Sequence, residues 1–165
     1  MILKFKQAKV QDLQKVLDIF KVAAEKVQKR GTQQWQHWLN PTPELLERVK
    51  NNLHNKQFFF VYHADETVGM FRLMDNDDEY WDKNEDSARY IHSFVTLPKY
   101  AGQGIGSAAL TLIARKVAAQ NIPLLRLDCK ADNLSLCNYY EQQGFAKVRL
   151  QEMPHYAVQL FEKKL

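Results

Sequence analysis

The spacing of apolar side chains changes twice between residues 89 and 117. Residues 90–97 are rich in aromatic and β-branched side chains, as strands are, and Pro98 ends that run. The turn over residues 102–106 contains three glycines, Gly102, Gly104 and Gly106. Beyond the turn, apolar residues recur at the spacing of one helix face, namely at Ile105, Ala108, Ala109, Leu112, Ile113 and Val117. The segment therefore predicts a strand, a glycine-rich turn and an amphipathic helix in succession.

The first third of the chain predicts a strand followed by two helices. Apolar and polar residues alternate over residues 2–7, which indicates the strand. Asp12 is placed to cap a helix that Gly31 ends, and a polar–aromatic connection covers residues 33–39. Thr42 is placed to cap the second helix, because a proline in the first turn and an apolar face follow it.

Strand patterns, one helix and one acidic segment account for the remaining chain. The further strands are expected at residues 58–63, 67–74, 124–129, 146–153 and 156–162. The first two of these form a hairpin, and a helical segment runs from Asn133 to the Gly144–Phe145 pair. Residues 75–86 form a loop that contains seven acidic side chains together with Tyr80 and Trp81.

Length and composition limit the class of protein. A chain of 165 residues fits one domain, residues 1–165, with a substantial core. The formal net charge of +4 suits a polyanionic cofactor, but without a Lys/Arg-rich run it does not indicate nucleic acid. No stretch has the pattern of a signal peptide or the length of a membrane span. Only two cysteines are present, Cys129 and Cys137, and we expect a cytoplasmic protein without a disulfide.

The glycine-rich turn before the helix predicts an anion site. Glycines leave the backbone N–H groups unobstructed, and the helix dipole favours negative charge there, such as a pyrophosphate. A P-loop would need a lysine after these glycines, and a dinucleotide-binding turn would need a third glycine where Ser107 stands. Asp128 lies where a ribose-binding acid would, so a nucleotide-dependent oxidoreductase stays an alternative. A turn that merely joins a strand to a helix is another alternative.

A second motif follows the strand at 124–129, in the residues Asn133, Leu136, Tyr140, Gly144 and Phe145. Together with the glycine turn, and in this order, it resembles the GNAT superfamily of acetyl-CoA-dependent N-acetyltransferases. The turn is similar to the pyrophosphate loop of that family. Ala101 departs from the family pattern, which usually has Arg or Gln there. We expect altered cofactor affinity rather than its loss, because backbone amides do most of the phosphate binding.

The resemblance implies an α/β (α+β) fold with a mixed, mostly antiparallel twisted sheet flanked by helices. It also implies acetyl-CoA as the cofactor, whose pantetheine arm enters where the strands 90–97 and 124–129 splay apart. The cofactor-binding residues implied in this way are Phe94, Val95, Thr96, Gly102, Gln103, Gly104, Ile105, Gly106, Ser107 and Asn133. Asn133 has an equally good alternative role as the cap of its helix.

Acetyl transfer from a thioester to an amine needs a general acid and a general base. Tyr140 is the candidate acid for the leaving thiolate, because a thiol titrates near about 8.5 and a phenol near about 10. Its alternative role is packing on the apolar face of its helix. His92 on the central strand is the candidate base, although a buried histidine with satisfied hydrogen bonds is the commoner case, and the acids of residues 75–86 are other candidates. The histidines are scattered without metal-ligand spacing, so we expect no metal site.

The acidic segment is the candidate for acceptor recognition. Its negative charge would attract a cation, and aromatic rings hold ammonium groups by cation–π contact. The aromatic residues considered for this pocket are Trp35, Trp38, Tyr80 and Trp81. The alternative is a solvated loop whose aromatic side chains only attach it to the sheet.

These predictions combine into one functional hypothesis. We expect an N-acetyltransferase that acts by direct attack in a ternary complex on a small-molecule or peptide amine, for which a small cationic amine is the first choice. A homodimer is compatible with the sequence. The main alternative is a non-catalytic regulator that binds acyl-CoA on the same fold.

Overall fold

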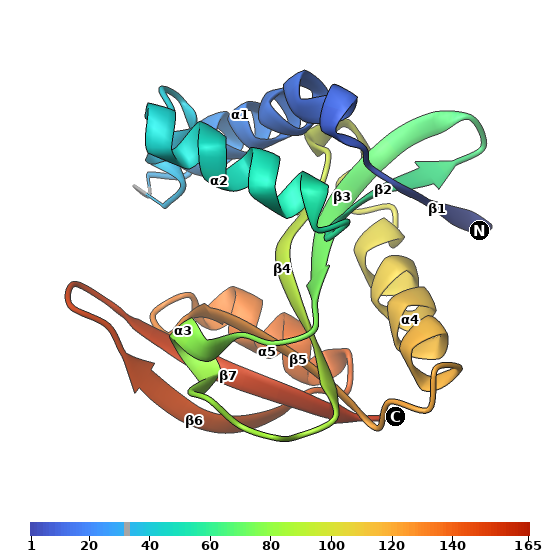
Figure 1. Cartoon of the computed structure of the whole chain (residues 1–165), viewed down its shortest axis with the longest axis vertical. Coiled ribbons are helices and arrows are strands. Elements are labelled where there is room, and N and C mark those ends of the chain that lie inside the picture. Colours follow the sequence, from blue (N-terminus) through green and yellow to red (C-terminus); the bar gives the residue numbers. More distant parts are fainter. Residues whose placement is uncertain (32–33) are drawn as a thin grey trace. The chain divides into compact units, whose positions relative to one another are not determined.

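The computed structural model describes residues 1–31 and 34–165, and the chain divides into two compact units. Unit 1 comprises Met1–Arg72 and Ser93–Ala108, and unit 2 comprises Leu73–His92 and Ala109–Leu165. Figure 1 shows the elements of both units along the chain. Among the described residues, none of the helices is both long and apolar enough to cross a membrane.

Unit 1 contains the N-terminal helices and the first hairpin. Its elements are β1 (Leu3–Gln7), the 3₁₀ turn η1 (Val10–Asp12), α1 (Leu13–Lys29), η2 (Gln36–Trp38), α2 (Pro43–His54), β2 (Phe58–His63) and most of β3 (Glu66–Met74). The end of β4 (Ala88–Thr96), η3 (Pro98–Tyr100) and the first residues of α4 (Ile105–Ala118) also belong to it. β1, β2 and β3 pair antiparallel, as expected for a hairpin and its neighbour.

The core of unit 1 lies where the two helices meet the strands. α1 and α2 run side by side (Figure 1). Phe20 of α1, Leu53 of α2 and Met70 of β3 are buried in one cluster, together with Phe58 and Val95. The apolar stripes that predicted the helices are therefore the faces that enter this core.

Two predicted helix caps have different outcomes. Oγ1 of Thr42 accepts a hydrogen bond from the N–H of Leu45 at 3.3 Å, which confirms Thr42 as the cap of α2. Asp12 stands at the cap position of α1 but makes no side-chain cap bond. Its carboxylate instead accepts from the N–H of Lys9, the residue before η1, at 2.8 Å. Asp12 is therefore the N-cap residue of α1, as predicted, but its side chain bonds the start of η1 and not the first turn of α1.

Unit 2 contains the C-terminal strands and the helix of the second motif. Its elements are the start of β4, the short α3 (Asp78–Trp81), the rest of α4, β5 (Leu124–Lys130), α5 (Leu134–Gln142), β6 (Ala146–Glu152) and β7 (Ala157–Lys164). β7 pairs antiparallel with both β5 and β6. We expected residues 75–86 to form a loop. The structure differs, because the short helix α3 forms within them.

The seven strands follow the order β1-β2-β3-β4-β5-β7-β6 in a mixed, mostly antiparallel sheet, as predicted. β4 and β5 pair in parallel, and this pairing ends at Ile91 and Leu127 although both strands continue. Ser93, two residues beyond Ile91, has a φ of 50°, which is rare for a residue with a Cβ. The backbone of β4 therefore changes course at the point where its pairing with β5 stops.

Most predicted elements lie within two residues of their observed bounds. The connection predicted at 33–39 contains η2, and its first residue, Gln33, lies outside the described residues. Cys129 and Cys137 are buried and form no disulfide, with their sulfur atoms 3.5 Å apart.

Candidate active site

The glycine-rich turn of unit 1 is open on its outer side. Gly102 and Gly104 have φ values of 76° and 74°, and a Cβ built on either would meet no heavy atom within 4 Å. α4 begins at Ile105, and the N–H of Ala108 donates to the carbonyl of Gly104 at 3.0 Å. The first N–H groups of an α-helix have no acceptor within the helix, so this end of α4 can receive an anion.

One amide of the predicted cradle is already used. The N–H of Gln103 donates to the carbonyl of Tyr100 at 3.4 Å and closes the turn after η3. The amide of Gln103, one of the residues expected to bind the cofactor, therefore already has an acceptor within the turn. The amides that remain as candidates are those of the glycines and of the first turn of α4.

The strand residues predicted to bind the pantetheine arm alternate in burial. Val95 is buried in the core of unit 1, whereas Phe94 and Thr96 are half-buried. The carbonyl oxygen of Val95 would lie only 2.2 Å from a Cβ built on Gly69 of β3, so only glycine fits there. Side-chain contact with a ligand is thus open to Phe94 and Thr96, and Val95 has only its backbone to offer.

Asn133 is the cap of α5. Its Oδ1 accepts a hydrogen bond from the N–H of Leu136 at 3.1 Å, so the capping role predicted from the sequence is confirmed.

Tyr140 lies inside unit 2 and is only 6% exposed. Its ring packs 5.7 Å from the ring of Phe161 and 6.1 Å from that of Phe145, measured between centroids. Burial raises the pKa of Tyr140 above its ordinary value, and the nearby Cys129 and Asp128 add to this shift. The phenol therefore keeps its proton across the neutral range, as an acid must, although a higher pKa also makes it a weaker acid.

His92 belongs to a compact group of ionisable side chains in unit 2, which we call the acid–histidine cluster: Asp77, His92 and Asp128. One ligand atom from each side chain lies within 4.8 Å of the other two, a spacing that would also admit a metal ion. Nε2 of His92 donates to Oδ2 of Asp77 at 2.7 Å and lies 3.7 Å from Oδ2 of Asp128. The predicted base thus has one ring nitrogen directed at two carboxylates.

Asp128 differs from the other members of this cluster in the hydrogen bonding and the pKa of its carboxyl group. Its Oδ2 is buried and has no hydrogen-bond partner among the described residues. Burial raises the pKa of Asp128 to about 6, the negative charges of Asp77 and Glu79 raise it further, and His92 opposes the shift. The side chain can therefore exchange a proton near neutral pH.

Most acids of residues 75–86 already have partners inside unit 2. The pairs are Asp75 with Arg89, Asp77 with His92, Asp82 with Arg149 and Asp86 with Arg126. Three of the seven acidic side chains thus form ion pairs with arginines, and Asp77 is bonded to a histidine, so the segment attracts a cation less strongly than its composition implies.

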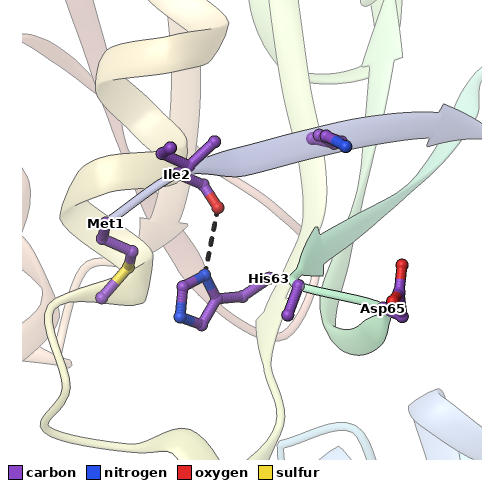
Figure 2. A pocket seen from close by; sticks show the side chains of 6 residues that line it. Met1, Ile2, His63 and Asp65 are labelled. Atoms are coloured by element: carbon purple, nitrogen blue, oxygen red, sulfur yellow. Dashed lines mark hydrogen bonds between the residues drawn. The ribbon is translucent and has the colours of Figure 1, made fainter.

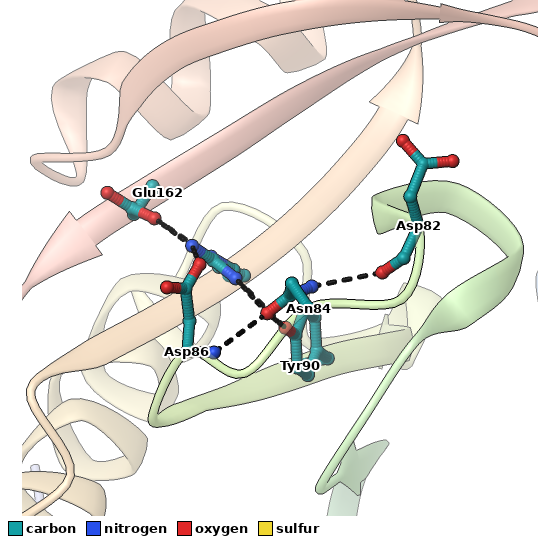
Figure 3. Close-up of polar contacts among 6 residues, drawn as sticks. Asp82, Asn84, Asp86, Tyr90 and Glu162 are labelled. Atoms are coloured by element: carbon teal, nitrogen blue, oxygen red, sulfur yellow. Dashed lines mark hydrogen bonds and ion pairs between the residues drawn. The ribbon is translucent and has the colours of Figure 1, made fainter.

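Arg126 is the centre of a buried network that holds this segment on the strands (Figure 3). Its guanidinium donates to Asp86 at 2.6 Å and to Glu162 at 2.8 Å. It also donates to the hydroxyl of Tyr90 at 2.9 Å and lies 4.5 Å from the centre of the Trp81 ring. Trp81, 7% exposed, is thus covered by the side chain of an arginine.

The other aromatic candidates have their own contacts. Tyr80 is half-buried, with its hydroxyl 3.1 Å from that of Tyr156 and its ring 5.8 Å from the ring of His92. In unit 1, Trp38 stacks on Phe20 with centroids 3.8 Å apart, and Trp35 packs on the same ring edge-on. The structure therefore brings the tryptophans of unit 1 together and places Tyr80 beside the acid–histidine cluster in unit 2.

A surface depression in unit 1 contains none of the predicted site residues. It is lined by Met1, Ile2, Lys4, His63, Ala64 and Asp65. Figure 2 shows Nδ1 of His63 directed at the carbonyl oxygen of Ile2, 3.0 Å away. The depression lies at the turn of the hairpin, and we assign no catalytic or binding role to its lining residues.

The sequence did not identify Asp128 or Arg126 as members of these clusters. Both lie in the interior of β5, where two charged side chains alternate with leucines before the strand ends at Lys130. A charged residue in a buried strand is uncommon without a partner or a function, and that was the available signal.

Comparison with known proteins identifies relatives of the whole chain. A model described as acetyltransferase (GNAT) family matches residues 19–145. An uncharacterized N-acetyltransferase of Bacillus subtilis, YesJ, is 23% identical over 161 residues, which cover 94% of this chain and 86% of that protein.

Solved structures have the same fold at low sequence identity. An acetyltransferase of the GNAT family from Listeria monocytogenes aligns with a TM-score of 0.78 and 18% identity, covering 99% of this chain and 95% of that one. The aminoglycoside acetyltransferase AAC(6')-Ib, in complex with coenzyme A and kanamycin, aligns with a TM-score of 0.76 and 14% identity over the same shares.

Proposed function

The chain belongs to the acetyltransferase (GNAT) family and is an N-acetyltransferase that uses acetyl-CoA, and on this premise we propose that its acceptor is a small cationic primary amine, attacked directly in a ternary complex. The acceptor side of the proposal is carried by the acid–histidine cluster, and the cofactor side by the open glycine turn at the start of α4. The turn fits the cofactor, because a polyanionic diphosphate needs close approach to backbone amides without any Cβ in the way.

The proposed cofactor contacts follow from the geometry of unit 1. The turn from Gly102 to Ser107 would hold the diphosphate, and the backbone of residues 94–96 would pair with the pantetheine arm. Asn133 would contact the cofactor in addition to capping α5. Acetyl-CoA, when bound, supplies the acetyl thioester.

Replacing Gly104 with alanine should weaken coenzyme A binding by at least about tenfold, a loss of roughly 1.4 kcal/mol. The methyl group would occupy the space through which the diphosphate approaches the amides, and titration calorimetry would measure the Kd. Gly31→Ala is the matched control, because Gly31 has a φ of 78° and equally open surroundings but lies at the end of α1. Both variants share the backbone strain, so an equal Kd in the two would contradict the cradle.

The proposed chemistry assigns one role to each side of the transfer. Tyr140, which retains its proton because it is buried, gives a proton to the leaving sulfur. The acid–histidine cluster receives the proton of the incoming amine. Removing that proton matters because an alkylammonium, with a pKa near about 10.4, has no lone pair for attack.

The proposal of a cationic acceptor rests on charge in unit 2. The acid–histidine cluster contains two carboxylates for one imidazole, and Tyr80 lies beside it. Of the four aromatic residues considered, Tyr80 is retained, because Trp81 is covered by Arg126 and the two tryptophans of unit 1 pack on Phe20. A protein of the same fold, AAC(6')-Ib, is solved with kanamycin, itself an amine-rich molecule.

Reversing the charges of Asp78 and Glu79 to lysine should raise the KM for a cationic amine, on the order of tenfold at low salt, and less at high salt. Both side chains are exposed on α3, whereas Asp77 is buried against His92 and its reversal would disturb the fold. Steady-state kinetics measure the effect. Reversing Glu141 and Glu152 instead changes the net charge equally and is the control; the same KM in both double variants would remove α3 from the proposal.

A thermal-shift series tests the proposed function as a whole. Coenzyme A and acetyl-CoA should stabilise the protein, by about 2.7 kcal/mol at a concentration of one hundred times Kd, and NADH should not. A panel of primary amines with thiol release as the readout follows. Stabilisation by NADH alone would favour the oxidoreductase alternative, and acetyl-CoA binding without thiol release for any amine would contradict the proposed acceptor class.

A further inference from the structure

The acid–histidine cluster contains one polar atom whose hydrogen-bonding capacity is unmet. Oδ2 of Asp128 is buried without a hydrogen-bond partner among the described residues. Nε2 of His92 lies 3.7 Å away and already donates to Asp77 at 2.7 Å. A buried carboxylate oxygen without a donor is costly, so it marks a place where a donor from outside the chain fits.

The charge of the cluster selects the kind of donor. With the imidazole of His92 protonated and both carboxylates ionised, the three side chains still have a net charge of −1. The side chain of Asp128 is 13% exposed and that of His92 is 17% exposed, whereas that of Asp77 is 4% exposed. The side chains of Asp128 and His92 are thus partly exposed, although the atom Oδ2 of Asp128 is itself covered in the structure. A positively charged donor complements the negative charge of the cluster.

We propose that Asp128 binds the ammonium group of the acceptor and takes its proton, while His92 and Asp77 act as positioning residues that hold the carboxylate in place. The inference rests on the proposed function and assigns the base that the transfer needs. It gives Asp128 the role that the sequence analysis gave to His92, whose Nε2 is hydrogen-bonded to Asp77 and here positions the carboxylates.

The proton balance of the step is complete with groups on the chain. The ammonium gives one proton to Asp128, which later releases it to solvent. The neutral nitrogen forms a bond to the acetyl carbon as the bond between that carbon and sulfur breaks. The sulfur takes the proton of Tyr140, and the second proton, lost from nitrogen as the amide forms, restores the phenol.

The ionisation of Asp128 agrees with this role. Its pKa of about 6 leaves it ionised at pH 7 yet basic enough to accept a proton. The titratable groups that face it are His92 from β4, Asp77 and Glu79 from the acidic segment, Tyr80 from α3 and Tyr140 from α5. Burial raises the pKa values of both tyrosines, so neither phenol titrates in the range where Asp128 does.

The test is the pH dependence of kcat/KM for three variants and two acceptors. Each group that titrates gives the pH profile of kcat/KM a sloping part, or limb. The two acceptors are primary amines with different ammonium pKa values, so a limb caused by the amine shifts between them and a limb caused by the enzyme does not. For the wild type we expect an enzyme limb near pH 6. Asp128→Asn should lose that limb and at least about 100-fold in kcat/KM at pH 7, with the Kd for acetyl-CoA unchanged. Glu141→Gln, which removes an exposed carboxylate from α5, should behave as the wild type.

His92→Gln separates the base from its positioning residue. His92 lowers the pKa of Asp128, so removing the imidazole should move the limb to higher pH and leave turnover at alkaline pH. If His92→Gln abolished the limb while Asp128→Asn kept it, the base would be His92 and the proposal would fail. If Asp128→Asn does not fold, His92→Gln decides alone: a limb that moves to higher pH supports Asp128 as the base, and a limb that disappears overturns the proposal.

Three further outcomes would each overturn a different claim. A metal ion is the competing occupant of the cluster, so loss of activity with a chelator and its recovery with a divalent cation would overturn the ammonium site. Wild-type protein that acetylates no amine would defeat the proposed function itself. Wild-type activity that Asp128→Asn retains in full would defeat only the inference about Asp128.

Discussion

Replacing Tyr140 with phenylalanine is expected to lower kcat by at least about 100-fold, the usual contribution of a general acid. The variant loses only the hydroxyl, and the ring keeps its contacts with Phe145 and Phe161, so the Kd for acetyl-CoA should stay within about twofold. Single-turnover kinetics with thiol release as the readout separate this step from binding.

The neighbouring tyrosine provides the control for this variant. Tyr139 is half-buried on the same helix, so Tyr139→Phe removes a hydroxyl one position away. We expect it to leave kcat within about twofold of the wild type. If Tyr140→Phe also kept full turnover, the phenol would be a packing group only, and the proton for the leaving sulfur would come from solvent. The raised pKa of Tyr140 further predicts no loss of activity by phenol ionisation at pH 9.

Replacing Arg126 with methionine should lower the free energy of unfolding by about 3 kcal/mol. The change leaves Glu162 partly buried, with 22% of its side chain exposed, and without its cationic partner. Asp86 is 52% exposed and can be hydrated again, which keeps the loss at the low end of the range for broken buried pairs. Urea denaturation at pH 7 measures the difference.

Arg126→Lys is the matched control, because it retains the charge but not the planar group that reaches two carboxylates and lies on the Trp81 ring. We expect an intermediate loss. A lysine variant as unstable as the methionine variant would mean that the charge of Arg126 contributes little and that its planar group and packing stabilise the unit.

The sequence by itself determined the local structure and the family, and through the family the cofactor. Periodicity predicted the strand–turn–helix segment that ends in α4, because apolar spacing reflects which face of an element is buried. The cap of α2 at Thr42 was predictable for a similar reason, since a cap satisfies N–H groups only a few residues away. The two motifs indicated the family because their residues lie within one turn and one helix, where spacing along the sequence is sufficient to recognise them.

Only the tertiary structure decided which side chains meet across the chain. Asp77, His92 and Asp128 come from three different elements, and no spacing in the sequence reveals that one nitrogen faces two carboxylates. The pairing of Asp86 with Arg126 likewise changed an apparently free acidic segment into a partly neutralised one. Long-range electrostatics and burial depend on distances in space, and these arise only when the strands of the sheet bring distant residues together.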